Sequence, residues 1–337
     1  MKKSFSFFIG VDVSKFKLDA CFLQADAKQG CHQVFDNTLK GIRMMIKWVH
    51  ELAAVSKENY LFCLEHTGIY AMPLCYYLGE QDYRFAMVPA LEILKSIGVK
   101  RGKTDKADAA AIAKYAQTRC DDIGLYSLPE KQLVKLKFLL THRNLLVKTR
   151  KTFHVALTEP SSFVEKDLIV DITRQSKQLI VNLDRKIKQI EKQITEVIEG
   201  NEQMKKTYDL LVSVPGIGPH IAAYLLVYTR CFTVFENSRK FACYAGIAPF
   251  EHQSGISIKG RSRVSHLANK RMKSLLNLAA LTAKKSDAQI KHYYERKIKE
   301  GKNPMLVLNN IRNKIVARIF ATIKRQTPYV FTMQFAA

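Results

Sequence analysis

The sequence predicts an α/β domain at the N-terminus, then a helical arm and a mostly helical C-terminal domain. In residues 1–125, short apolar segments with period two alternate with segments of helical period, which favours a mixed sheet. Residues 126–200 carry an apolar stripe with steps of three and four, which predicts long helices. Residues 201–337 contain a Gly/Pro-rich corner and amphipathic helices, so we expect a compact helical domain there.

The first predicted strand, Phe5–Val13, is the segment around which the N-terminal domain is organised. Its alternation indicates a half-buried strand, and its apolar character places that strand in the middle of the sheet. Asp12 lies inside it, and a carboxylate there is costly unless a cation pairs with it. Gly10, on the same face, leaves room for a backbone or a phosphate. We therefore expect Asp12 to contribute to a metal site; the alternative is a solvated aspartate at a strand end.

The remaining elements of this domain follow from period and turn residues. We expect further strands at Leu18–Leu23, Cys31–Phe35, Tyr60–Glu65 and Arg84–Val88. We expect helices around Ile42–Val49, and at Ile69–Leu78, Ala90–Ile97 and Ala109–Gln117. The resulting order is three strands followed by alternating helices and strands.

Three further carboxylates occupy positions that suit a metal site. Glu65 ends a predicted strand, while Asp105 and Asp108 lie three residues apart on one face of a first helical turn. Two metals that act on a phosphodiester need carboxylates from separate elements. Individually, these residues also fit a strand-end charge and acids that favour a helix dipole. A basic cluster suited to phosphate precedes the helix, at Lys100, Arg101 and Lys103.

Two long helices are predicted in the arm. The first covers Lys131–His154, and the second carries the stripe Leu179–Ile198 before Gly200 ends it. A coiled-coil seam between two chains and a helical pair within one chain both explain this stripe.

The C-terminal domain contains two candidate nucleic-acid contacts. Gly216 and Gly218 form a tight turn between two helices, where backbone N–H groups can hold a phosphate. A plain helical corner is the alternative. Farther on, Ser254 is followed by a glycine and by basic residues, so it is either a nucleophile or part of a loop that contacts phosphate. The basic residues are Lys259, Arg261, Arg263, Lys270 and Arg271. Basic amphipathic helices follow at Ala288–Lys299 and Pro304–Lys324.

The overall composition favours a nucleic-acid partner. The chain of 337 residues has 54 Lys+Arg against 30 Asp+Glu, a net charge of +24. No segment has the length and apolarity of a transmembrane helix, so no membrane partner is expected. The 7 cysteines are scattered without a CxxC pair, which indicates reduced thiols. We therefore expect a cytoplasmic protein that associates with the nucleoid.

The acidic residues resemble the tetrad of the RuvC-like branch of the ribonuclease-H fold. They are Asp12 in GVDVSK, Glu65 in LEHTG, and Asp105 and Asp108 in KTDKADA. Together with SVPGIGP, which is similar to a helix-hairpin-helix, FACYAGIAP and QSG, they resemble the DEDD transposases of the bacterial IS110 family, the bridge-RNA-guided recombinases. The likeness extends from about Phe7 to about Ala283.

The resemblance implies a transposase that cuts and rejoins DNA. Ser254 would be the nucleophile, and the acidic tetrad would hold Mg²⁺ or Mn²⁺. It also implies a guide RNA and a homodimer or homotetramer. One departure is that the family's lysine–glycine–asparagine before the last helix of the serine domain is replaced by His266–Lys270. Two alternatives remain: a metal-dependent, structure-selective nuclease such as a Holliday-junction resolvase, and a non-catalytic DNA-binding protein.

Overall fold

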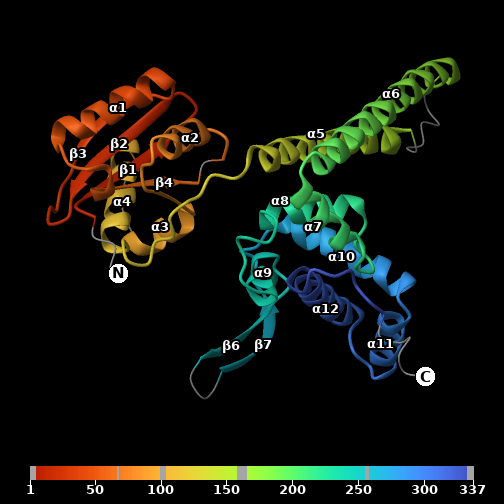
Figure 1. Cartoon of the computed structure of the whole chain (residues 1–337). Helices are drawn as coiled ribbons and strands as arrows, with labels where there is room; N and C mark the ends of the chain where they lie inside the picture. Colours follow the sequence, from red (N-terminus) through yellow and green to blue (C-terminus); the bar gives the residue numbers. More distant parts are fainter. Residues whose placement is uncertain (1–4, 67, 99–103, 158–164, 255–257, 332–337) are drawn as a thin grey trace. The chain divides into compact units, whose positions relative to one another are not determined.

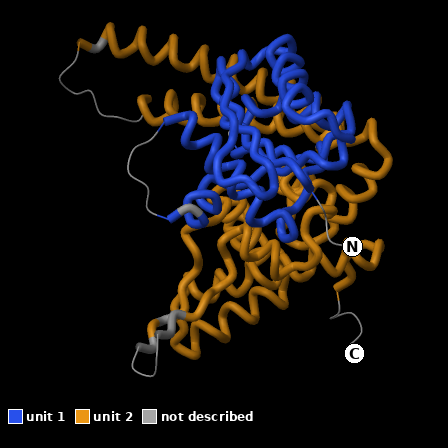
Figure 2. The backbone as a smooth tube through the Cα atoms, turned by 90° about the vertical axis from the view of Figure 1, so that its left-hand side faces the viewer, with its two compact units in different colours: residues 1–128 blue, residues 129–337 orange. Residues whose placement is uncertain are grey.

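The computed structural model describes residues 5–66, 68–98, 104–157, 165–254 and 258–331. The chain divides into two compact units, unit 1 (residues 1–128) and unit 2 (residues 129–337) (Figure 2). Unit 1 is an α/β unit, and unit 2 is mostly helical. The described part of the chain contains twelve α-helices and seven strands. None of these helices combines the length and the apolarity that crossing a bilayer requires.

Unit 1 is built on a five-stranded mixed sheet with the order β3-β2-β1-β4-β5 (Figure 1). The strands are β1 (Phe7–Val13), β2 (Lys17–Gln24), β3 (Cys31–Asp36), β4 (Tyr60–Glu65) and β5 (Phe85–Val88). Strand β1 pairs antiparallel with β2 and parallel with β4. All five predicted strands are therefore confirmed to within two residues at each end, and β1 is the central strand.

Helices cover both faces of this sheet. One face packs on α1 (Leu39–Leu52) and α2 (Met72–Glu80). The other packs on α3 (Ala90–Ile97) and α4 (Asp105–Thr118). A short 3-10 turn, Lys57–Asn59, leads into β4.

Strand β1 is buried on both faces, so the prediction of a half-buried strand was wrong. Ile9 and Val11 pack in the cluster under α1 and α2. Phe8 points to the opposite face, where it is only 2% exposed beneath α4. A strand flanked by two helical layers has no solvent face, and the alternation in its sequence does not distinguish the layers.

Unit 2 begins with two long antiparallel helices, α5 (Lys131–Ala156) and α6 (Lys166–Glu199). Two ion pairs join them with opposite sequence order, Arg143–Glu191 and Arg150–Asp184. Most of the stripe on α6 is buried within the single chain, where Ile187 is 5% and Ile194 is 8% exposed, whereas Leu179 at its start is 45% exposed. The stripe therefore packs in a helical pair within one chain, and Ile187 and Ile194 are not a seam between two chains in this conformation.

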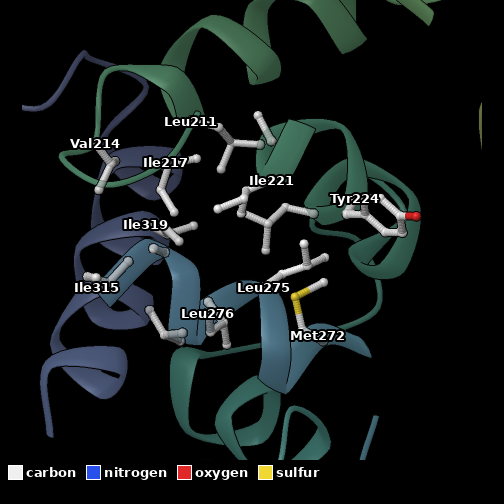
Figure 3. Packing of buried hydrophobic residues seen from close by; sticks show 14 of the residues in the cluster. Leu211, Val214, Ile217, Ile221, Tyr224, Met272, Leu275, Leu276, Ile315 and Ile319 are labelled. Carbon is white, nitrogen blue, oxygen red and sulfur yellow. The ribbon is translucent and has the colours of Figure 1, made fainter. Parts of the chain in front are cut away.

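The rest of unit 2 is a helical assembly with one β-hairpin. Its helices are α7 (Glu202–Val212), α8 (Pro219–Thr229), α9 (Ser238–Tyr244), α10 (Lys270–Ser286), α11 (Ala288–Lys299) and α12 (Pro304–Arg325). Leu211, Ile221, Leu275 and Ile315 come from α7, α8, α10 and α12, and they pack in one cluster (Figure 3). That cluster also includes Leu136 and Ile198, so the ends of α5 and α6 near this core are part of it.

The sequence did not predict the β-hairpin of unit 2. It consists of β6 (Pro249–Ser254) and β7 (Ile258–Val264). We expected no strand there, only a basic segment that follows Ser254. A two-stranded ribbon with polar residues on both faces lacks the apolar alternation that reveals a strand.

Candidate active site

Asp12 and Glu65 lie side by side at one edge of the sheet in unit 1. The last registered pair of β1 and β4 is Val11 with Leu64, so the next residue on each strand is a carboxylate. Successive side chains alternate between faces, so both carboxylates share a face with Gly10 and Cys63. This is the face that α4 covers.

Helix α4 crosses β1 at Gly10, where the two backbones are in close contact. A Cβ atom on Gly10 would lie 2.4 Å from the carbonyl oxygen of Ala109 and 2.2 Å from the amide nitrogen of Ala113. The prediction that Gly10 leaves room for an approaching backbone is therefore confirmed. Because only glycine permits this approach, Gly10 sets where α4 lies on the sheet.

The direction of α4 places its first turn toward Asp12. Near the other end of the helix, Gln117 Nε2 donates to the carbonyl oxygens of Gln24, Ala25 and Ala27, at 2.9, 2.7 and 3.1 Å. Gln24 pairs with Phe7, at the start of β1. Helix α4 therefore runs opposite to β1, and the turn that carries Asp105 and Asp108 lies at the Asp12 end.

The start of α4 is fixed by a cap. Thr104 Oγ1 accepts a hydrogen bond of 3.2 Å from the amide of Ala107. Asp105 is exposed and Asp108 is partly buried in the first turn. Carboxylates in this turn interact favourably with the helix dipole, which lessens the cost of bringing them close to Asp12.

The electrostatics of Asp12 show that the carboxylates are close to one another. Burial, as the largest cause, and then the charges of Glu65, Asp108, Asp105 and Asp19 together raise the pKa of Asp12 to about 6. A carboxyl group surrounded by other carboxylates holds its proton more tightly, because ionisation adds repulsion. A divalent cation would remove that repulsion.

Asp19 is a further carboxylate that the sequence analysis missed. It pairs across the sheet with Asp12, and it is 7% exposed. Its Oδ1 lies 3.0 Å from Nε2 of His32. The available signal was a single acidic residue within an otherwise apolar strand, Lys17–Gln24.

The donor set fits a hard divalent cation, although the side chains do not form a complete coordination shell. Within the described residues, no three carboxylate, histidine or cysteine side chains are close enough together to hold a metal ion. Mg²⁺ retains several waters and binds through one or two carboxylates together with substrate phosphates. Asp12, Glu65, Asp105 and Asp108 supply oxygen ligands of this kind. The basic cluster predicted beside them, Lys100, Arg101 and Lys103, lies outside the described residues.

Ser254 belongs to unit 2, at the last position of β6. It pairs with Ile258 at the start of β7, which lies antiparallel to β6. Gly255, the glycine expected to follow it in the turn, lies outside the described residues. The basic residues Lys259, Arg261 and Arg263 lie on β7, the strand that returns beside β6. The backbone thus places Ser254 next to a basic strand.

The glycines between α7 and α8 have different environments. Gly216 has a φ of +91°, and a Cβ atom there would lie 2.4 Å from the carbonyl oxygen of Ala279 on α10. Packing against α10 therefore explains why this residue is glycine. Gly218 has no heavy atom within 4 Å of a Cβ position, and it precedes α8 without a side-chain cap. Of the two, Gly218 is the one that leaves space for a ligand.

Lys270 and Arg271 open α10. Its cap is Asn269, whose side chain accepts a hydrogen bond of 2.9 Å from the amide of Met272 and donates one of 2.7 Å to the hydroxyl of Tyr244. The residue therefore has a structural role that orients the start of α10.

Two family models match the chain. Residues 9–159 match the DEDD transposase model of the IS110 type, and residues 208–295 match the model described as transposase IS116/IS110/IS902 family. Together they cover well over half of the chain.

Curated relatives agree with these matches. The pilin gene-inverting protein of Moraxella bovis is 28% identical over 330 residues, which are 96% of this chain and 97% of the relative. The corresponding protein of Moraxella lacunata is also 28% identical over 330 residues, with the same coverage. An uncharacterized 43.6 kDa protein of insertion element IS110 from Streptomyces coelicolor is 32% identical over 120 residues, 36% of this chain and 29% of the relative. The chain therefore belongs to the IS110 family of transposases.

Proposed function

We propose that this chain is a DNA transposase that cuts and rejoins strands to move a mobile element, with Ser254 as nucleophile and an acidic tetrad as metal site. The tetrad is Asp12, Glu65, Asp105 and Asp108. The observation that carries the proposal is the convergence of these carboxylates at one end of β1, where Glu65, Asp108 and Asp105 raise the pKa of Asp12. RuvC-like active sites share this arrangement of strand and helix carboxylates.

In the proposed reaction, Ser254 attacks the phosphorus of a DNA phosphodiester. The bond between Oγ and phosphorus forms as the bond between phosphorus and the leaving sugar oxygen breaks. The serine proton passes to a base, and the sugar oxygen gains a proton to become a free hydroxyl. Attack of a sugar hydroxyl on the phosphoserine then rejoins a strand and restores the serine. Bond energy is conserved in the phosphoserine, so no nucleotide cofactor is needed.

The carboxylates have a binding role in this scheme. A bound Mg²⁺ or Mn²⁺ would supply neutralisation of the charge that develops on the phosphoryl oxygens. Asp12 and Glu65 would hold it from the sheet, and Asp105 and Asp108 from the first turn of α4. Gly10 and Gln117 act indirectly, because they determine where that turn lies.

The proposed partners are donor and target DNA and a guide RNA, in a homodimeric or homotetrameric assembly. The net charge of +24 supports a polyanionic partner. The names of the Moraxella relatives, which describe inversion of a pilin gene, support rearrangement of DNA as the outcome. The family resemblance supports the guide RNA.

Two variants test the proposal on a supercoiled plasmid that carries the ends of the element and its flanking DNA. Ser254→Ala should abolish strand cleavage while leaving DNA binding intact, and Asp105→Asn should do the same. Ser262→Ala, an exposed serine on the neighbouring strand β7, is the matched control and should cleave normally.

Denaturing gels and peptide mapping should find DNA attached to Ser254 after a nicked substrate traps the wild-type enzyme. Cleavage by Ser254→Ala without any covalent product in the wild type would instead identify a nuclease that uses water. If Asp105→Asn still cleaves DNA and its cleavage still depends on the metal, the role of the acidic tetrad is refuted.

A further inference from the structure

Arg143, on α5, connects two partners with one guanidinium group. Its Nη2 lies 2.6 Å from Oε1 of Glu191 on α6, and its Nε donates to the same oxygen at 2.8 Å. Its Nη1 lies 3.2 Å from Nε2 of His220, the second residue of α8. A guanidinium can only donate, so Nε2 of His220 accepts this hydrogen bond and the ring is neutral.

Arg271, on α10, lies against Tyr224 and has an unused donor. Its guanidinium lies 5.0 Å from the centre of the Tyr224 ring, and its Nη2 donates to the tyrosine hydroxyl at 3.4 Å. The hydroxyl of Tyr224 in turn donates to the carbonyl oxygen of Leu140 at 3.3 Å. The Nε atom of Arg271 is buried without a hydrogen-bond partner among the described residues. Leaving a charged donor unpaired in this way costs free energy that a bound acceptor would recover.

The side chain of Tyr224 marks where this polar group lies relative to the core. In Figure 3 its ring lies at one side of the side chains that are drawn, near Met272, and its hydroxyl points away from them. His220 packs edge-on against the same ring, with centres 4.9 Å apart. His220 and Arg271 therefore both lie against Tyr224, and Arg143 joins this group through its hydrogen bond with His220.

The positive charge of this group is only partly balanced. The group contains two guanidinium groups but one carboxylate, Glu191, which pairs with Arg143 and whose side chain is 45% exposed. Burial and the charges of Arg143 and Arg271 lower the pKa of His220 to about 4. Helix α8 also begins here without a side-chain cap, which adds the positive end of its dipole.

We propose that Arg143, His220 and Arg271 bind a phosphate of a nucleic-acid backbone, and that Glu191 competes with this phosphate for Arg143 in the free protein. Guanidinium groups match phosphate oxygens with two parallel hydrogen bonds, and neutral His220 offers Nδ1–H as a further donor. The inference rests on the proposed function, and it adds a defined contact that the family assignment does not supply.

A backbone phosphate fits this site better than a small phosphorylated ligand. The side chains of Arg143 and Glu191 are 18% and 45% exposed, so the site is at the surface and not in an enclosed cavity. A polymer can contact such a site while further basic residues hold the neighbouring phosphates. DNA and RNA share this phosphodiester chemistry, and probes of both types distinguish them.

The arm offers a matched control. Arg150 and Asp184 form the same kind of ion pair between α5 and α6, at 2.6 Å. They lie two helical turns from Arg143 and Glu191, because each residue is seven positions away along its helix. Among the described residues, Arg150 makes this contact to Asp184 and no hydrogen bond to a histidine, unlike Arg143.

The test measures binding of the full-length protein to fluorescent DNA and RNA oligonucleotides of the same sequence, by anisotropy at several salt concentrations. Arg271→Gln and Arg143→Gln should each weaken binding by about 10-fold or more, the loss of one charge-assisted hydrogen bond. The slope of log affinity against log salt should become shallower by about 0.7–0.9, which is one phosphate. Glu191→Gln should tighten binding by about 2–5-fold, because it releases Arg143 from an exposed ion pair.

The controls Arg150→Gln and Asp184→Asn should leave both affinity and slope unchanged. Circular dichroism of every variant checks folding, and the gain expected for Glu191→Gln cannot arise from unfolding. Weaker binding by Glu191→Gln, wild-type binding by Arg271→Gln, or an equal loss in Arg150→Gln would each overturn the inference. Failure of the wild-type protein to bind either oligonucleotide would overturn the proposed function as well.

Discussion

Replacing Asp12 with asparagine should stabilise unit 1 of the metal-free protein at neutral pH. The folded state raises the pKa of Asp12 to about 6, from an ordinary value of 3.8. Between these values the folded protein binds more protons than the unfolded chain, so the free energy of unfolding falls as the pH rises from about 4 to about 6. Above pH 6 the ionised carboxylate costs stability, and the neutral amide of asparagine removes that cost.

The size of the effect follows from the shift in pKa. One pKa unit corresponds to about 1.4 kcal/mol, so a shift of about two units sets an upper value of about 3 kcal/mol. Asp12 is only partly buried, and solvent screens part of the repulsion. We therefore expect Asp12→Asn to raise the free energy of unfolding by about 1–2 kcal/mol at pH 8, and to have no effect below pH 4.

Trp48 makes this measurement specific to unit 1 within the full-length protein. It is the only tryptophan of the chain, it lies on α1, and it packs near Phe22 and Phe35 in the core of unit 1. Denaturation followed by tryptophan fluorescence in the presence of a chelator therefore reports the unfolding of unit 1. The proposed metal site predicts that adding Mg²⁺ stabilises the wild-type protein, because the carboxylates are brought together only in the folded state, and that it has less effect on Asp12→Asn.

Asp121→Asn, an exposed residue beyond the end of α4, is the control and should change neither stability nor the response to Mg²⁺. A loss of stability in Asp12→Asn at pH 8 would refute the reasoning. So would a gain that persists unchanged at pH 3.5, where the carboxyl group is already neutral. Either result would mean that repulsion between carboxylates is not the main contribution of Asp12 to the free energy of unfolding.

Three further predictions concern packing and charge. Gly10→Ala should destabilise unit 1 by about 1–3 kcal/mol, because the added methyl group collides with the backbone of α4. Gly124→Ala, where the Cβ position has open space around it, should not change the stability. Tryptophan fluorescence during denaturation measures the stability of both variants. Ile187→Ala should destabilise the α5–α6 pair by about 2–5 kcal/mol and speed its proteolysis. Val181→Ala, at a position that is 67% exposed, should have neither effect. Equal rates of proteolysis for the two variants would contradict the internal packing of the arm. DNA affinity should fall by about 10³–10⁵ between about 50 and about 200 mM salt if the protein contacts about 6–10 phosphates, and an anisotropy titration with little salt dependence would exclude such a backbone interface.

Much of the α/β unit could be predicted, because its strands are short, apolar and bounded by clear turn residues. Asp12 and Glu65 could be recognised from the sequence because each is a carboxylate within an otherwise apolar predicted strand, where burying a charge is costly unless a cation pairs with it. The contribution of Asp19 was harder to predict, because it depends on the pairing register of β1 with β2. The pairing register depends on contacts between distant segments, so the sequence of one segment alone does not determine it.

The candidate nucleic-acid contacts show where sequence patterns are insufficient. Gly216 and Gly218 belong to one motif, yet Gly216 packs against α10 and Gly218 faces open space. The cluster around Arg143 joins residues from α5, α6, α8 and α10, and no spacing rule links positions so far apart. Likewise, Ile187 has the same heptad pattern whether its partner is a second chain or α5 of its own.

The length of α6 would set the distance between any two DNA contacts made at its ends. At 1.5 Å per residue, its 34 residues extend for about 51 Å. Successive base pairs are about 3.4 Å apart, so this distance equals about 15 base pairs of straight duplex. Contacts made at the two ends of this helix would thus be separated by about one and a half turns of the double helix, and would address different sides of it. Inserting or deleting one heptad in α6 would change the distance between two such contacts by about three base pairs.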